Sequence, residues 1–172
     1  MTIIDYLYKY RGKYEPVDSF ELVKYFAKNF ISNEVLDNFH RLFPKHFIDA
    51  SKFPETILTR EIAGLGGIDS ENLYFMENPD FNGMIDLDKI NNKLVNVRIQ
   101  IFSEGVWNWS RKRKILRKYL LIKNYLDNNF VFEDNILGEG LAWGNEDFLL
   151  MLRKDNNPVP YLSFTVTDNR YI

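Results

Sequence analysis

The sequence of 172 residues contains no cysteine. This absence excludes disulfide bonds, thiolate zinc sites and a cysteine nucleophile, and it suits a reducing cytoplasm. Histidine is nearly absent as well, because His40 and His46 are the only two. They lie on either side of Pro44, so they do not share a helical face as a metal-binding pair would. We interpret both as structural or surface residues, and we expect no metal and no cofactor.

Long apolar runs are also missing. No stretch approaches the roughly 18 uncharged apolar residues that a membrane-spanning helix needs, so we expect no contact with a membrane. The first residues carry charge from Asp5 onward and lack the apolar segment of a signal peptide. These features favour a cytoplasmic protein. The abundance of Asn, Lys, Ile, Phe and Tyr is typical of an AT-rich genome and suggests a bacterial or phage source.

The overall composition, with 45% apolar and 27% charged side chains, is typical of a globular protein. We find no repeat or linker, so we predict one domain over residues 1–172. Apolar side chains at helical spacing predict helices in the first third and again over 110–129, and alternating patterns predict strands between and after them. The expected helices cover 3–8, 20–30, 32–43, 54–64 and 110–129, and the expected strands cover 72–76, 83–90, 93–102, 148–152 and 161–167. The order predicts an α+β fold, in which a helical N-terminal third precedes a mostly antiparallel sheet with one inserted amphipathic helix.

Charge is unevenly distributed. Residues 111–118 hold six of the 22 Lys and Arg residues, so the rest of the chain has 16 cations against 24 carboxylates. The stretch 124–152 contains no Lys or Arg and six acidic residues. A basic block is therefore followed directly by an acidic one.

The basic block belongs to the segment VWNWSRKRKILRKYL (106–120). Tryptophan beside Lys and Arg is typical of surfaces that bind single-stranded nucleic acid. The candidate residues for such a surface are Trp107, Trp109, Arg111, Lys112, Arg113 and Lys114. Two alternatives remain open: a solvated helix face whose cations pair with the acidic run at 127–147, and a surface for a protein partner. The acidic balance of the remaining chain argues against a dedicated nucleic-acid binder.

The stretch PDFNGMIDLDKINNKLVNVRIQIF (79–102) resembles the layout of PD-(D/E)xK nucleases. The resemblance implies that Asp80 or Asp86 supplies a first metal-binding acid. The acid-x-Lys positions would fall on Arg98 and Gln100, which are neither the acid nor the lysine. The resemblance therefore implies at most a degenerate relative of these nucleases, and we interpret Asn82-Gly83 in the same stretch as a hairpin turn.

The acidic block contains a tryptophan among turn residues, which suits an interface anchor surrounded by charge. The candidate partner-binding residues are Glu133, Asp134, Glu139, Trp143, Glu146 and Asp147. An acidic face is how small inhibitors meet basic partners, because complementary charge raises the association rate. Our leading hypothesis from the sequence is a non-enzymatic bacterial protein of the immunity or inhibitor type, which neutralises a basic, nuclease-like toxin. The alternative is a nucleic-acid-binding protein, or a degenerate PD-(D/E)xK-like nuclease, that uses the basic block.

Overall fold

The computed structural model describes residues 14–49, 68–77, 80–133, 140–156 and 159–171. Its helices are α2 (Ser19–Asn29), α3 (Val35–Leu42) and α4 (Asn108–Asn129), and a short 3-10 helix, η3, covers Asn169–Tyr171. Its strands are β1 (Ile48–Asp49), β2 (Ile68–Glu77), β3 (Phe81–Ile90), β4 (Lys93–Ser103), β5 (Val131–Glu133), β6 (Leu141–Gly144), β7 (Phe148–Asp155) and β8 (Tyr161–Asp168). The helices expected at 3–8 and 54–64 lie outside the described residues.

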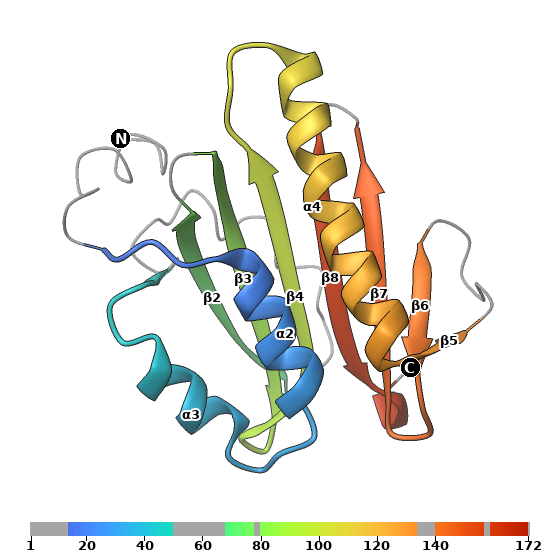
Figure 1. The fold of residues 1–172 in the computed structure, drawn as a ribbon. Helices are drawn as coiled ribbons and strands as arrows, with labels where there is room; N and C mark the ends of the chain where they lie inside the picture. The colour runs from blue at the N-terminus through green and yellow to red at the C-terminus, as the bar shows by residue number, and fades with distance from the viewer. Residues whose placement is uncertain (1–13, 50–67, 78–79, 134–139, 157–158, 172) are drawn as a thin grey trace.

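All eight strands form one antiparallel sheet in the order β1-β2-β3-β4-β8-β7-β6-β5. The helices α2 and α4 lie across one face of this sheet (Figure 1). The predicted α+β fold is confirmed, including the single helix inserted among the strands. Among the described residues, no helix is long and apolar enough to cross a bilayer.

The core lies between the sheet and the helices. Alternate residues of the central strands, such as Ile99 of β4 and Phe164 of β8, are fully buried there. From the helical side, Phe26 of α2 and Ile122 of α4 pack into the same cluster. The alternation in β4 that predicted a strand therefore also predicted which of its faces is buried.

The prediction of a turn at Asn82-Gly83 is wrong. Both residues lie within β3, opposite Met76 and Phe75 of β2. The reason for the glycine is space: a Cβ at Gly83 would lie 2.3 Å from the carbonyl oxygen of Gln100 and 2.5 Å from Cζ of Phe75. The tight turn lies at the other end of β3, where Asn91-Asn92, both with positive φ, join β3 to β4.

Candidate functional site: the start of α4

A short turn after β4 places the first residues of α4 at the surface. Gly105 has φ +149°, a backbone conformation that favours glycine. The chain then enters α4 after Trp107, whose backbone is extended. Trp107 and Trp109 are each 66% exposed, and Val106 is exposed as well. Three large apolar side chains therefore stand in solvent at one end of the longest helix.

The six cations of the basic block do not share one environment. Lys114 reaches back to the start of β3, where its Nζ lies 2.6 Å from Oδ1 of Asp80 and 3.3 Å from the carbonyl oxygen of Glu104. The guanidinium of Arg111 donates to the carbonyl oxygen of Gly105. Both side chains hold the turn that leads into α4, although the sequence suggested that they contact a nucleic acid.

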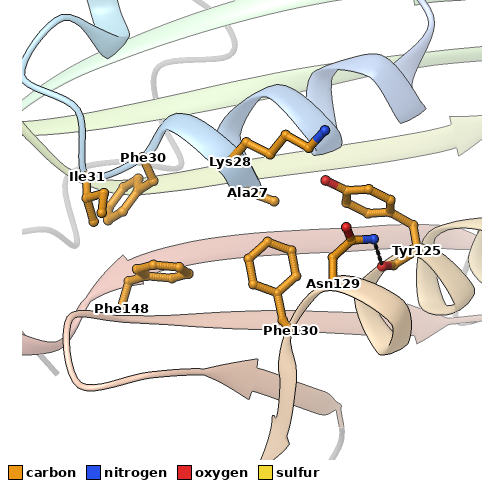
Figure 2. Close-up of a pocket in the computed structure, with 8 residues that line it drawn as sticks. All are labelled: Ala27, Lys28, Phe30, Ile31, Tyr125, Asn129, Phe130 and Phe148. Atoms are coloured by element: carbon orange, nitrogen blue, oxygen red, sulfur yellow. Dashed lines mark hydrogen bonds between the residues drawn. The ribbon is translucent and has the colours of Figure 1, made fainter.

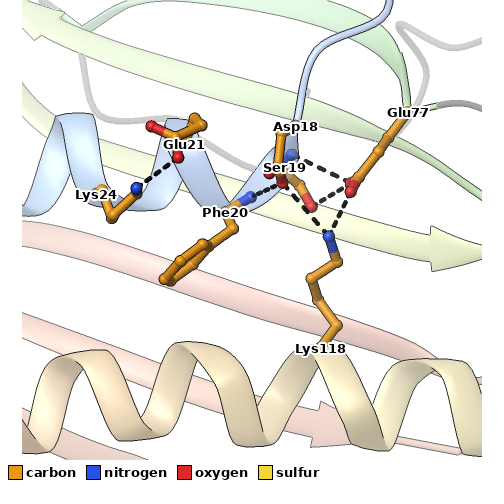
Figure 3. Close-up of polar contacts among 7 residues, drawn as sticks. All are labelled: Asp18, Ser19, Phe20, Glu21, Lys24, Glu77 and Lys118. Carbon is orange, nitrogen blue, oxygen red and sulfur yellow. Dashed lines mark hydrogen bonds and ion pairs between the residues drawn. The ribbon is translucent and has the colours of Figure 1, made fainter.

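Lys118 points into the protein and is 9% exposed. Figure 3 shows its ammonium group paired with the carboxylate of Glu77, with Oδ1 of Asp18 3.5 Å away. Glu77 in turn accepts hydrogen bonds from the backbone N–H and the hydroxyl of Ser19, and Asp18 caps α2 by accepting from the N–H of Phe20 at 2.8 Å. This network joins the start of α2, the end of β2 and the middle of α4.

The counter-charges of the basic block therefore come from Asp80, Glu77 and Asp18. Among the described residues, no ion pair joins the basic block to the acidic run at 127–147. The internal pairing that the sequence suggested does occur, but with different acids.

Three cations of the block remain at the surface. Lys112, Arg113 and Arg117 are exposed and form no ion pair within the described part of the chain. Together with Trp107 and Trp109 they define what we call the Trp-Arg surface. Arg117 belongs to the basic block that the sequence suggested as a nucleic-acid-binding helix, but it was not among the individually named candidates.

The acidic candidates are dispersed. Glu133 is half-buried on the edge strand β5, whereas Glu146 and Asp147 are exposed in the turn between β6 and β7. Asp134 and Glu139 lie outside the described residues. The three described carboxylates therefore come from two different elements, the edge strand β5 and the turn after β6.

Trp143 is fully buried in the core, and this finding corrects its assignment as an interface anchor. Its indole N–H donates to Oδ1 of Asp127 at 3.0 Å. The hydrogen bond from Lys123 holds the pKa of Asp127 below its usual value, and the bond from Trp143 adds to this effect. Trp143 and Asp127 therefore fasten the sheet to α4 and are not accessible to a partner as a pair.

The residues that resemble a nuclease core do not converge. The carboxylate of Asp80 is occupied by Lys114, and Asp86 lies in the middle of β3 opposite Arg98. Gln100 pairs with Met84, two positions further along the same two strands. Among the described residues, no group of three or more His, Asp and Glu side chains could hold a metal ion.

Three adjoining clefts lie near the C-terminal end of α2, and Phe30 lines each of them. The cleft between α2 and α4 has a volume of about 320 Å³. A second cleft of about 330 Å³ is bordered by Glu146 and Asp147, and a third of about 540 Å³ lies beside α3. Ile31, which lines the first two, is 58% exposed. The sequence analysis did not identify these clefts.

Comparison with known proteins gives a partial match. No family model matches the chain, and no solved structure matches it. The chain is similar to Ribonuclease 3 of Bacteroides thetaiotaomicron, with 40% identity over 72 residues. These residues are 41% of this chain and 22% of the ribonuclease, so the chain matches about a fifth of that enzyme's length.

Proposed function

We propose that the protein binds single-stranded RNA through the Trp-Arg surface. The observation that carries this proposal is that two tryptophans stand two-thirds exposed at the start of α4, beside three cations in the first half of this helix that form no ion pair with any described residue. Nucleobases stack on exposed aromatic rings, and phosphates are neutralised by Lys and Arg. The partial similarity to an enzyme named a ribonuclease supports RNA as the nucleic acid to test first.

The local charge supports this choice further. The first turn of α4 contains no acidic residue. The carboxylates that lie against the block, Asp80 and Glu77, are already paired with Lys114 and Lys118. A polyanion that approaches Arg113 and Arg117 therefore meets positive charge and apolar rings. The proposal concerns binding alone, because the described residues bring no metal-binding acids together.

The test is a titration of labelled single-stranded RNA against the protein at several salt concentrations. We expect the double variant Arg113→Glu/Arg117→Glu to lose at least tenfold in affinity, and its dependence of log K on log salt to become shallower by about one to two units. The matched control is Arg41→Glu/Lys45→Glu, which changes the net charge equally at two exposed positions beside α3. This control should bind nearly as the wild type does.

Replacing both tryptophans with alanine should weaken binding about tenfold or more, because stacking contributes roughly 1–3 kcal/mol per base. Duplex RNA and single-stranded DNA of the same sequence show whether the surface prefers an unpaired strand and ribose. If the wild type does not bind RNA at an ionic strength of about 50 mM, where such binding is strong, the proposal is rejected.

An inhibitor of a basic protein is the second candidate. It is favoured by Glu146 and Asp147, which are exposed beside a cleft and close to the protruding Ile31. Carboxylates around an exposed apolar side chain are typical of a charged rim around an interface anchor. The test uses a basic partner that purifies with the protein and measures the rate at which the two associate. This rate should fall in the variant Glu146→Gln/Asp147→Asn. It should not change in Arg113→Glu/Arg117→Glu. A toxin partner, a bacterial source and a cytoplasmic location remain part of this proposal.

A further inference from the structure

One row of side chains on α4 connects the Trp-Arg surface to the cleft between α2 and α4. In an α-helix every fourth residue is displaced by about 40° around the axis. The row at this spacing begins at Trp109 and ends at Asn129, about 30 Å away along the helix. Its members are Trp109, Arg113, Arg117, Leu121, Tyr125 and Asn129. The row therefore winds from the solvent-facing side of α4 to the side that faces α2.

The solvent exposure of these side chains changes along the row as it turns towards α2. Its first four members, from Trp109 to Leu121, are exposed, Tyr125 is half-buried against α2, and Asn129 stands at the end of α4. In Figure 2, Tyr125 and Asn129 face Ala27 and Lys28 across the cleft. A chain molecule that lies on the row would be led from the Trp-Arg surface into the cleft.

The walls of the cleft are aromatic. Phe148 stacks edge-to-face with Phe30 on one side and with Phe130 on the other, with ring centroids 6.3 Å apart in both pairs. Tyr125 and Phe130 are also 6.3 Å apart. The volume of about 320 Å³ lies at the lower end of the range for small-molecule pockets. Flat aromatic groups match such walls better than aliphatic chains do.

Two polar side chains stand at the rim of the cleft. Lys28 places its ammonium group 6.0 Å from the centroid of the Tyr125 ring. The amide nitrogen of Asn129 donates to the carbonyl oxygen of Tyr125 at 2.7 Å, which leaves its amide oxygen free to accept. The rim therefore offers a cation for a phosphate and a hydrogen-bond acceptor for a base edge.

Charge separates this cleft from the neighbouring one. The adjoining cleft is lined by three carboxylates, Glu146, Asp147 and Asp168, and by two cations, Lys93 and Arg170, of which Arg170 pairs with Asp168. The cleft between α2 and α4 has Lys28 and no acidic side chain in its lining. A polyanion that follows the row is consequently attracted more strongly to the first cleft than to the second.

We propose that this cleft receives an unpaired nucleobase of the RNA strand whose backbone follows the row from Trp109 to Asn129. The inference rests on the proposed RNA binding and adds a second, separate contact to it. The base stacks on the phenylalanine walls, Lys28 pairs with its phosphate, and the phosphates between the two ends lie on Arg113 and Arg117.

The experiment blocks the cleft from its exposed rim and leaves the core intact. Asn129→Trp places a ring over the opening, and Lys28→Glu reverses the charge at the opposite rim. Asn128→Trp is the matched control, since Asn128 is exposed, carries the same substitution and does not line the cleft. Each variant is titrated with single-stranded RNA of about sixteen nucleotides, and thermal melts establish that it folds.

We expect Asn129→Trp and Lys28→Glu each to lower the affinity about tenfold, the scale of one stacked base, and Asn128→Trp to leave it unchanged. A photoreactive uridine in the RNA should crosslink to peptides that contain Tyr125 and Phe130, and Asn129→Trp should remove that crosslink while crosslinks at Trp107 and Trp109 persist. If both rim variants bind RNA as the wild type does while Arg113→Glu/Arg117→Glu does not, the cleft has another occupant and this inference fails alone. If the wild type binds no RNA, the inference fails together with the proposed function.

Discussion

The basic block and the acidic block follow one another in the chain but are built differently. The basic block lies within a single helix, so the helical period assigns each of its cations to a definite side of α4. The acidic block extends over the end of α4, the short strands β5 and β6 and the turn after them, so its described carboxylates, Asp127, Glu133, Glu146 and Asp147, come from three different elements. A run of like charge becomes a surface only where regular structure orients it. Three experiments test this difference, and the one with the largest expected effect comes first.

The largest effect is expected at Lys118. This residue is buried, although it belongs to a basic block in which most side chains are at the surface. We expect Lys118→Met to reduce the free energy of unfolding by about 3–5 kcal/mol, because it leaves Glu77 without its cation. Lys112→Met should change it by less than about 0.5 kcal/mol. Urea denaturation measures both values. A smaller loss in Glu77→Gln/Lys118→Met than in Lys118→Met alone would assign the effect to the unpaired carboxylate.

The tryptophans offer a second test, since the acidic block contains a buried one and the basic block has two exposed ones beside it. Trp143→Phe should lower the free energy of unfolding by about 1.5–3 kcal/mol, the scale of a hydrogen bond to a charged group. Trp109→Phe should leave it nearly unchanged. Denaturant titration measures the change, and acrylamide should quench the fluorescence of Trp107 and Trp109 but not that of Trp143. Equal losses in the two variants would contradict the division into core and surface rings.

The smallest expected effect concerns pH and the ion pair between Lys123 and Asp127, the first carboxylate of the acidic block. The pKa of Asp127 is lowered by its hydrogen bonds from Lys123 and Trp143. The ionised form is therefore favoured in the folded state, and its stabilising effect is complete above the ordinary aspartate pKa of about 3.9 and is lost as the pH falls below it. Melting temperatures of the wild type and Asp127→Asn should differ slightly at pH 6, and the difference should shrink as the pH falls below about 3.9. A difference that does not shrink as the pH falls below about 3.9 would show that the effect does not come from titration of Asp127.

Much of the fold could be predicted from the sequence where a period is long and unbroken. The alternation of Val95, Val97, Ile99 and Ile101 predicted β4, and the spacing of Ile115, Ile122 and Leu126 predicted α4. The strands β5 and β6 have three and four residues, too few for a period to appear. The turn at Asn82-Gly83 was wrongly predicted because the reason for Gly83, the ring of Phe75 from a neighbouring strand, is not visible in local sequence.

The candidate site was predictable only in part. Trp107, Trp109, Lys112 and Arg113 were identified, and the structure places all four at the surface. Arg111 and Lys114 were identified with them, but they stabilise the turn before α4. Arg111 bonds to a backbone carbonyl group and Lys114 pairs with Asp80, which is distant in the sequence, so neither partner could be predicted. Lys118 lies on the same face of α4 as Ile115 and Ile122, so the helical spacing implied that it is buried. The spacing gave no indication of its partners on β2 and next to α2. The aromatic cleft joins α2, α4 and β7, and such a meeting depends on topology and not on any local pattern.

The order of the strands has a consequence for how the chain is made. The strand that appears latest in the chain, β8, lies in the middle of the sheet and pairs with β4 on one side and β7 on the other. During synthesis the hairpin of β3 and β4 can form early, but the two halves of the sheet cannot join until β8 has left the ribosome. A pairing such as Asn96 with Thr167 then closes a loop of 71 residues, which makes this step slow. Until that moment one edge of β4 has unpaired backbone groups, and such an edge can pair with strands of other chains.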